Sequence, residues 1–377
     1  MTNNITIGVP REIKQGEKRV GLKPAKNGVA ELVKKGFVVL IEKSAGLGSG
    51  FSDIEYREAG ARIVSQKELW EKSDIIVKVK EPLPEEFKFF RRDLIVFCFL
   101  HLAPNKKLTN ALIKSGVTAI AYETVEPEQH NTPILRSMSL IAGRVGAIEG
   151  ANLLKENKGM LLGPETNVMI VGLGNAGMSA ITEIINPLNK NALPNLYLID
   201  INPQKLEAVK QLLHPHMDYK KLSPMKYDKK TLSKVMPNID LIIGTTHSPG
   251  KLQEKLITAD MIKSMKPGSV AVDISIDQGG CFETSKPTSI AHRTFVKFGV
   301  THYCVPNIPG IVPRDSTNAL TAETFPYLVE LAGKGFEKAV KGNLALKRGV
   351  NIFKGKITHE TLAESTGQKY TPLEELL

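Results

Sequence analysis

The feature that most constrains this 377-residue chain is a regular alternation of apolar, β-rich runs with segments of helical periodicity. Between the runs lie KNGVAELVKKG and NKKLTNALIKSG, which place apolar residues three and four apart and end on Gly, as helices do. Strands that alternate with helices predict βαβ units and a largely parallel sheet. The expected strands of the first series are ITIGVP (from Ile5), FVVLIEK (from Phe37), DIIVKVK (from Asp74), LIVFCFL (from Leu94) and VTAIAYE (from Val117).

A second series of the same kind lies between two long helical patterns. The first pattern runs from about Leu135 to Leu154 and is rich in Gly and Ala, and the other runs from Asn318 to about Lys347. Because these patterns flank the second series, we predict that it is inserted into the first domain. The expected strands of the second series are in NVMIVGLGNAG, NLYLID, DLIIGTT, SVAVDIS and THYCVPN.

The predicted fold class is therefore α/β, with two Rossmann-like domains that each contain a parallel sheet. The first domain is expected to be discontinuous and to comprise residues 1–134 and 308–377, whereas residues 135–307 form the inserted domain. The length agrees with two domains, since domains usually contain about 100–200 residues.

The composition narrows the classes of function. The formal net charge is +11, but the lysines are spread along the whole chain and are not interleaved with stacking aromatic residues. We therefore expect a solvated basic surface that attracts acidic metabolites, and no nucleic-acid partner.

Cysteine usage and hydropathy bear on the compartment. Cys98, Cys281 and Cys304 are widely spaced, which argues against a disulfide scaffold and against a CxxC metal site, so we predict no metal. The N-terminal residues lack the apolar core of a signal peptide. The most apolar stretch, Leu94–Ala103, is about half of what a membrane-spanning helix needs. We expect a cytoplasmic protein with no membrane partner.

A glycine-rich motif predicts a nucleotide site in the second domain. The apolar run Val168–Val171 leads directly into Gly172–Gly177 (GLGNAG), and a helical segment follows. Glycines in this pattern let the backbone turn tightly and approach a pyrophosphate, while the helix N-terminus offers unpaired N–H groups. The residues expected to contact the cofactor here are Gly172, Gly174, Asn175, Ala176 and Gly177.

An acidic residue selects between the two nicotinamide cofactors. Asp200 ends the next expected strand, 23 residues after Gly177, near the spacing of an acid that binds the adenosine ribose. Its charge would repel a 2′-phosphate, and no Arg follows it within INPQK, so NAD is predicted over NADP. The alternative is an ordinary tight turn in which Asp200 only caps the strand end.

Four polar residues lie at or just beyond expected strand ends, where ligands bind in α/β sheets. Arg19 follows the first strand, Lys80 ends DIIVKVK, His101 follows LIVFCFL, and Asp277 follows VDISI. Taken singly, each has a simpler explanation: Lys80 as an edge lysine and His101 as a core histidine, for example. The sequence alone does not show that the four converge.

Nearly the whole chain resembles the alanine dehydrogenase and pyridine-nucleotide transhydrogenase family, and within it most closely the alanine dehydrogenases. The segment VDISIDQGGCFETS is the most specific, because a generic dinucleotide-binding domain does not require it. The matching runs are GVPREIKQGEKRVGLKP, IVKVKEP, FLHLAP, AYETV, SMSLIAGRVGAIEGA, MKPGSVAVDISIDQGGCFETSKPTS, HYCVPNIPGIVP and PYLVELAGKG.

The resemblance implies reversible oxidative deamination of L-alanine by NAD⁺ to pyruvate and ammonium, in a homohexamer. By motif, Arg19 would bind the substrate carboxylate, and Lys80 the keto oxygen or carboxylate of pyruvate. His101 and Asp277 would be the acid–base pair. A histidine suits proton transfer near neutral pH, and an anionic Asp277 can orient water and stabilise a cationic iminium.

The resemblance also implies further cofactor contacts. Asn307 would line the nicotinamide pocket, Ser139 would contact the cofactor, and Lys205 would lie near the ribose that Asp200 binds. A helix-face hydroxyl and a surface lysine are the simpler readings of Ser139 and Lys205.

Several positions depart from the family pattern, around the cofactor and the C-terminal helices rather than at the four substrate positions. The Gly177–Asp200 interval is also a few residues longer than is usual. These departures leave room for another amino or keto acid as substrate. They are Leu140, Ile308, Asp315, Ala322–Glu323 and the run His247–Glu254.

Three other functions stay open at this point. An imino-acid reductase would join a keto acid to a larger amine. A transhydrogenase-like NAD(H)-binding subunit would pass hydride to a membrane partner, but Thr132–Ser137 lacks the Arg-Ala-Gln loop of those subunits. A non-catalytic NAD(H)-binding protein would have no use for Arg19, Lys80, His101 and Asp277 together.

Overall fold

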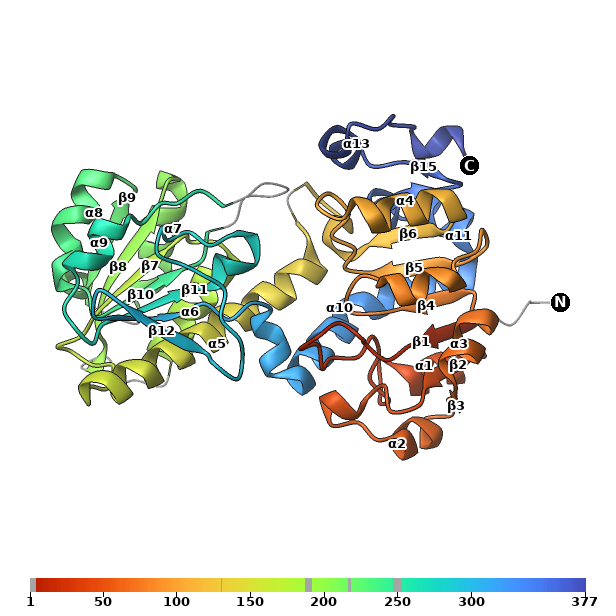
Figure 1. Cartoon of the computed structure of the whole chain (residues 1–377), viewed down its shortest axis with the longest axis horizontal. Coiled ribbons are helices and arrows are strands. Elements are labelled where there is room, and N and C mark those ends of the chain that lie inside the picture. The colour runs from red at the N-terminus through yellow and green to blue at the C-terminus, as the bar shows by residue number, and fades with distance from the viewer. Residues whose placement is uncertain (1–4, 130, 187–191, 216–217, 247–252) are drawn as a thin grey trace. The chain divides into compact units, whose positions relative to one another are not determined.

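The computed structural model describes residues 5–129, 131–186, 192–215, 218–246 and 253–377. The chain divides into two compact units: unit 1 comprises Met1–Met138 and Val312–Leu377, and unit 2 comprises Ser139–Ile311. Each unit contains a mostly parallel sheet with helices packed against it (Figure 1). The predicted α/β fold with two parallel sheets is confirmed.

The sheet of unit 1 has the strand order β15-β14-β6-β5-β4-β1-β2-β3. The strands β1 to β6 run parallel to one another, whereas β14 is antiparallel to both β6 and β15. The strands are β1 (Thr6–Val9), β2 (Val38–Glu42), β3 (Arg62–Val64), β4 (Ile75–Val77), β5 (Ile95–Cys98), β6 (Thr118–Ala121), β14 (Val350–Phe353) and β15 (Lys356–Ile357).

Helices lie on both faces of this sheet, with α4 in front and α11 behind in Figure 1. Alternate apolar residues of the strands therefore face a core on each side; for example, Val96 and Cys98 of β5 pack in one cluster with Trp70 of α3 and Leu108 of α4. The helices are α1 (Val29–Lys34), α2 (Asp53–Glu58), α3 (Gln66–Lys72), α4 (Lys106–Ser115), α10 (Pro313–Lys334), α11 (Phe336–Gly342), α12 (Leu344–Gly349) and α13 (Glu360–Thr366).

The sheet of unit 2 has the order β12-β13-β11-β10-β7-β8-β9, and only β12 is antiparallel to its neighbour among the strands described. Figure 1 shows helices packed along this sheet as well. The elements are β7 (Asn167–Val171), β8 (Asn195–Asp200), β9 (Leu222–Lys226), β10 (Leu241–Gly244), β11 (Val270–Asp273), β12 (Thr294–Lys297), β13 (Val300–Tyr303), α6 (Asn175–Ile185), α7 (Pro203–Leu213), α8 (Lys229–Val235) and α9 (Ala259–Ser264). The long helix α5 (Pro133–Lys158) contains the division between the two units after Met138.

Both sheets have a point at which the chain reverses its direction of winding. In unit 1 the chain moves from β1 to β2 and β3, then returns to place β4 on the other side of β1. In unit 2 it moves from β7 to β8 and β9, then places β10 on the other side of β7. Ligands of open α/β sheets bind beyond the strand ends at such a point, so the loops after β1, β4, β7 and β10 are where binding residues are expected.

Some expected elements end earlier or divide differently. The strand expected to end at Lys80 is β4, which ends at Val77, so Lys80 lies in the following loop. The helical pattern expected over Asn318–Lys347 is three helices, α10, α11 and α12. Gly335, with a φ of 74°, ends α10, because the left-handed backbone conformation is one that an α-helix cannot continue through.

The sequence reasoning did not anticipate β3, β9, β12, β14 and β15. These strands lie toward the margins of the sheets, and β3 and β15 have only three and two residues, too few for an apolar pattern. Strand β9 also contains Pro224, which lacks the N–H of a central strand and is tolerated at an edge.

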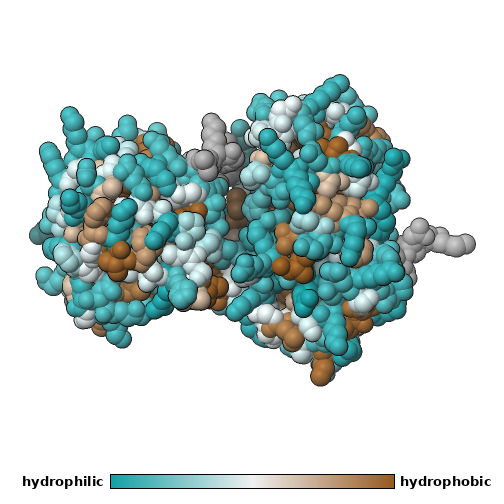
Figure 2. All heavy atoms as spheres, viewed as in Figure 1, coloured by the Kyte–Doolittle hydropathy of each residue, from teal (hydrophilic) through white to brown (hydrophobic). Residues whose placement is uncertain are grey.

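On the faces visible in Figure 2, hydrophilic residues cover most of each unit, and hydrophobic residues appear as small separate patches. Among the described residues, no helix combines the length and the apolar composition that crossing a bilayer requires.

Candidate functional site

In unit 1 the predicted residues Arg19, Lys80 and His101 follow β1, β4 and β5, which are neighbours in the sheet. Because these strands are parallel, their carboxyl ends lie at the same edge, and β1 and β4 flank the reversal point. The topology therefore gathers three basic side chains at the edge where α/β sheets bind ligands.

Arg19 is held by an acidic residue two positions earlier. Its side chain is 2% exposed, with Nε 2.8 Å from Glu17 Oε1 and Nη2 2.5 Å from Glu17 Oε2. Its Nη1 lies 3.2 Å from Met138 Sδ. This two-point pair fixes the plane of the guanidinium, and the pairing with Arg19 outweighs burial and lowers the pKa of Glu17 to about 2. Glu17 therefore stays ionised at neutral pH.

Lys80 lies in a loop that a buried glutamate ties to the segment after β1. Glu12 Oε1 accepts a hydrogen bond of 2.6 Å from Val79 N, and Glu12 Oε2 accepts one of 3.4 Å from Lys80 N. The neighbouring Lys78 is buried and pairs with Glu86 at 2.5 Å and with Glu12 at 3.7 Å. Of the two lysines in VKVK, Lys78 is therefore paired inside a buried charge cluster. Lys80, by contrast, is half-buried.

His101 is exposed and adopts a backbone conformation that is uncommon for residues other than Gly. Its φ is 47°, and its N–H donates a hydrogen bond of 2.7 Å to Glu123 Oε1. Its ring stacks on Phe99 at 6.0 Å between centroids. The alternative explanation of His101 as a buried core histidine therefore does not hold. The left-handed conformation is of the kind that functional sites retain.

The glycine motif in unit 2 has the geometry that a dinucleotide requires. Gly172 has a φ of 97°, which favours Gly, and begins the turn after β7. A Cβ added to Gly177 would lie 2.0 Å from the Gly172 carbonyl oxygen, so only Gly permits this approach of α6 to the turn. A Cβ on Gly174 would meet nothing within 4 Å, so Gly174 borders open space at the N-terminus of α6. The residues present fit a pyrophosphate group.

Asp200 ends β8 and contacts this same turn. Its Oδ2 accepts a hydrogen bond of 2.7 Å from Leu173 N, and its Oδ1 accepts one of 2.9 Å from Asn202 N. A carboxylate has about four acceptor positions, so these bonds leave capacity for ribose hydroxyls. Lys205 lies exposed in the first turn of α7, three residues after Asn202, which caps that helix.

Asp277 lies at the carboxyl end of β11, in the 3₁₀ helix Ile274–Gln278, and is exposed. Both of its carboxylate oxygens accept from the N–H of Asn307, at 3.2 and 3.0 Å. Asn307 itself has a φ of 55°. The structure thus brings together two predicted site residues from segments about 30 positions apart.

The remaining predicted contacts are placed as follows. Asn175 and Ala176 begin α6, directly after the glycine turn. Ser139 lies in α5 and belongs to unit 2, whereas Arg19, Lys80 and His101 belong to unit 1. Within the run His247–Glu254, residues 247–252 lie outside the described part of the chain.

Sequence reasoning missed the acidic residues that hold the basic ones, namely Glu12, Glu17 and Glu123. It also missed Thr245, whose hydroxyl donates a hydrogen bond of 2.6 Å to the Gly172 carbonyl oxygen from the end of β10. Glu12 and Glu17 stand within the run PREIKQGEKR, beside Arg19, and this proximity was an available signal.

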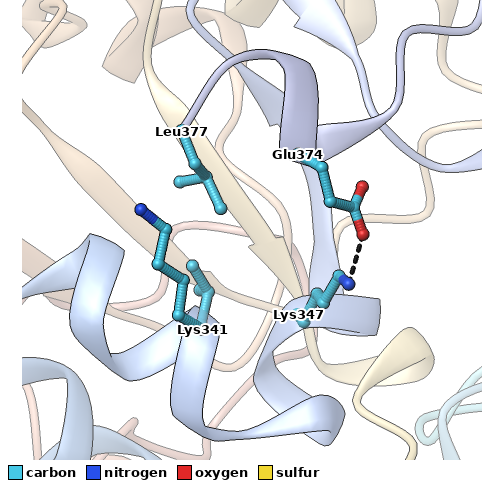
Figure 3. A pocket seen from close by; sticks show the side chains of 5 residues that line it. Lys341, Lys347, Glu374 and Leu377 are labelled. Atoms are coloured by element: carbon cyan, nitrogen blue, oxygen red, sulfur yellow. Dashed lines mark ion pairs between the residues drawn. The ribbon is translucent and has the colours of Figure 1, made fainter.

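A pocket within unit 1 lies among α11, α12 and the C-terminal residues. Figure 3 shows Lys341, Lys347, Glu374 and Leu377 around it, with an ion pair between Lys347 and Glu374. Its lining includes none of the predicted site residues, and we assign it no function.

Known protein families and individual proteins are similar in sequence to nearly the whole chain. Residues 8–142 match the family described as Alanine dehydrogenase/PNT, N-terminal domain, and residues 147–360 match Alanine dehydrogenase/PNT, C-terminal domain. The chain is 45% identical to an alanine dehydrogenase of Staphylococcus haemolyticus over 98% of this chain and 99% of that protein. It is 43% identical to alanine dehydrogenase 2 of Staphylococcus aureus, with the same coverage.

Solved structures of proteins with the same fold are also similar to this chain. An L-alanine dehydrogenase structure matches with a TM-score of 0.88 and 38% identity, over 96% of this chain and 99% of that one. A transhydrogenase from Sinorhizobium meliloti matches with a TM-score of 0.80 and 22% identity, over 93% of this chain and 99% of that one, which shows a shared fold. The chain belongs to the alanine dehydrogenase/PNT family of oxidoreductases.

Proposed function

We propose that the protein catalyses the NAD-dependent, reversible oxidative deamination of L-alanine to pyruvate and ammonium. The observation that carries this proposal is the set of Arg19, Lys80 and His101 at the carboxyl ends of three adjacent parallel strands, beside the reversal point of the sheet. The high identity to named alanine dehydrogenases supports the choice of substrate.

In this proposal the inserted domain, residues 135–307, binds NAD, and residues 1–134 and 308–377 bind the substrate. NAD⁺, when bound, supplies the acceptor of the substrate hydride. Gly174 and the N-terminus of α6 would face its pyrophosphate, and Asp200 its adenosine ribose. An anionic Asp200 selects NAD over NADP because it repels a 2′-phosphate. Asn307, Ser139 and Lys205 are proposed as further cofactor contacts.

The substrate would be oriented by the two basic side chains of unit 1. Arg19, with its plane held by Glu17, would bind the carboxylate, and Lys80 the keto oxygen or carboxylate of pyruvate. Because the ionised Glu17 balances the charge of Arg19, Lys80 would supply the net positive charge that suits an anionic α-keto acid. The open alternatives of serine and 2-aminobutyrate differ from alanine by one small group, which is worth only about 1–3 kcal/mol in a pocket.

His101 and Asp277 are proposed as the acid–base pair. His101 would accept and return protons at the substrate nitrogen or oxygen, since a neutral imidazole has one nitrogen that donates and one that accepts. Asp277 would orient the attacking water and stabilise the cationic imine of the substrate. The N–H of Asn307 holds the Asp277 carboxylate in place.

The test is the absorbance of NADH at 340 nm with purified protein and pyruvate, with ammonium or with lysine or ornithine as the amine. We expect consumption that requires ammonium. Consumption with a larger amine alone would identify an imino-acid reductase instead. Binding of NADH without consumption in any mixture would favour a transhydrogenase-like binding subunit. We also propose a homohexamer, which light scattering of the purified protein tests.

A further inference from the structure

A buried carboxylate beside the predicted site organises the turn that contains Asp277. Asp273, the last residue of β11, is completely buried. Its Oδ1 accepts a hydrogen bond of 3.0 Å from Ser275 N. Its Oδ2 accepts three, from Cys281 N at 2.9 Å, Phe282 N at 3.3 Å and Ser285 Oγ at 2.5 Å. One carboxylate therefore binds both ends of the segment from 274 to 285.

The chain must reverse tightly to bring these donors to one point. Gly279 and Gly280 have φ values of 95° and 79°, and the N–H of Gly280 donates to the Ser275 carbonyl oxygen at 3.0 Å. A Cβ added to Gly280 would lie 2.5 Å from Asp273 Oδ2. The two glycines therefore permit the backbone to wrap closely around the Asp273 side chain.

Asp277 lies inside the segment that Asp273 closes, and its own side chain is exposed. The Asp277 carboxylate accepts hydrogen bonds from the Asn307 N–H. Its direction is therefore set by the Asn307 N–H together with the backbone of the Ile274–Gln278 helix, whose first turn Asp273 caps through Ser275 N.

We propose that Asp273 is a positioning residue, which holds the 274–285 turn so that Asp277 is presented to the substrate. This inference rests on the proposed function, because it assumes that Asp277 acts in the reaction. The Asp273 side chain is completely buried and does not reach solvent. Burial raises the pKa of Asp273, and the hydrogen bonds from Ser285, Phe282 and Cys281 act against that effect.

The test compares Asp273→Asn with Asp277→Asn and with a matched control, Asp240→Asn. Both Asp273 oxygens accept from backbone N–H groups. In Asp273→Asn one oxygen becomes an NH₂ group, which cannot accept, so the turn loses at least one of these hydrogen bonds. Asp240 is a buried carboxylate of the same unit that accepts from Asn167 N at 3.0 Å and pairs with Lys158 at 2.8 Å, just before β10 begins. It lies at the opposite end of the strands from Asp273.

For each variant, NADH-binding sites are counted by fluorescence titration, and kcat and KM for pyruvate are measured per binding site. We expect Asp273→Asn to lower kcat per site by about 10- to 100-fold, since small displacements of a reacting group cost that much, with KM changed less than about 3-fold. Asp240→Asn should lower the unfolding temperature but keep the wild-type kcat per site.

Wild-type kcat per site in Asp273→Asn, beside an inactive Asp277→Asn, would overturn the positioning role alone. Full activity of Asp277→Asn would overturn the catalytic assignment and this inference with it. If Asp273→Asn does not bind NADH, Ser285→Ala decides, because it removes only the hydroxyl that donates to Asp273 Oδ2. A reduced kcat per site in Ser285→Ala supports the inference, and an unchanged one overturns it.

Discussion

Arg19 and Lys78 are both buried cations, and buried carboxylates compensate the charge of each. The two differ in what surrounds the charge. Lys78 forms ion pairs with both Glu12 and Glu86, so its ammonium group is fully paired within this buried cluster. Arg19 shares one edge of its guanidinium with Glu17. Removing one partner from such a buried pair is costly, because the other charge is left uncompensated.

Asp200 allows a test of cofactor choice at the scale of one residue. We expect Asp200→Ala to raise KM for NAD⁺ by about 10-fold and to relax discrimination against NADP⁺, since the repulsion of a 2′-phosphate is lost together with the bond to Leu173 N. Steady-state kinetics with both cofactors measure this. The control is Asp228→Ala, which removes the carboxylate that caps α8. Unchanged constants for both cofactors would remove Asp200 from the ribose site.

At the scale of elements, strand ends were predictable where a long apolar run precedes a polar residue. This reasoning found β5 and β7 and, with them, the places of His101 and Gly172. Short strands such as β3 and β15 have too few residues for a pattern to emerge. Carboxylates such as Asp273 were not predicted as site residues, because their donors become neighbours only when the chain folds.

The glycine turn before α6 provides a prediction with an internal control. A Cβ at Gly177 would lie 2.0 Å from the Gly172 carbonyl oxygen and 2.9 Å from Thr245 Oγ1, so Gly177→Ala should lower the unfolding temperature and weaken NADH binding. A Cβ at Gly174 meets open space, so Gly174→Ala should fold with an unchanged unfolding temperature. It should nevertheless raise the Kd for NADH by about 10-fold or more, because the methyl group occupies the approach of the pyrophosphate.

Thermal unfolding and NADH fluorescence titration measure the two effects separately. Wild-type NADH affinity in Gly174→Ala would show that the cofactor does not approach this residue. An unaltered unfolding temperature in Gly177→Ala would contradict the close packing of α6 on the turn.

At the scale of the whole molecule, buried charge links stability to pH. Burial raises the pKa of Glu12 to about 7, although Lys78, at 3.7 Å, and the Val79 N–H act against it. Glu17 and Glu86 also face this carboxyl and raise its pKa further. Since the folded pKa exceeds the ordinary value of 4.5, the protonated form stabilises the fold below pH 4.5, and this contribution is lost as the pH rises through 7.

Glu12→Gln should remove this dependence. We expect the variant to gain free energy of unfolding relative to wild type between pH 5 and pH 8, by an amount on the order of 3 kcal/mol. Urea unfolding at both pH values measures the difference. Glu71→Gln, at a largely exposed carboxylate, should show no such change. A difference between Glu12→Gln and wild type that does not vary with pH would contradict the raised pKa.

His101 and Asp277 are the two residues proposed to carry the chemistry of an ammonium-dependent reaction. The direct measurement is the rate of NADH consumption with pyruvate and ammonium, per NADH-binding site, in wild type, His101→Asn and Asp277→Asn. Asn tolerates the left-handed backbone of His101 but cannot transfer a proton near neutral pH. We expect ammonium-dependent turnover in wild type and at least about 100-fold lower rates in both variants, with NADH still bound. Wild-type rates in either variant would remove that residue from the reaction, and turnover that does not need ammonium would rule out oxidative deamination.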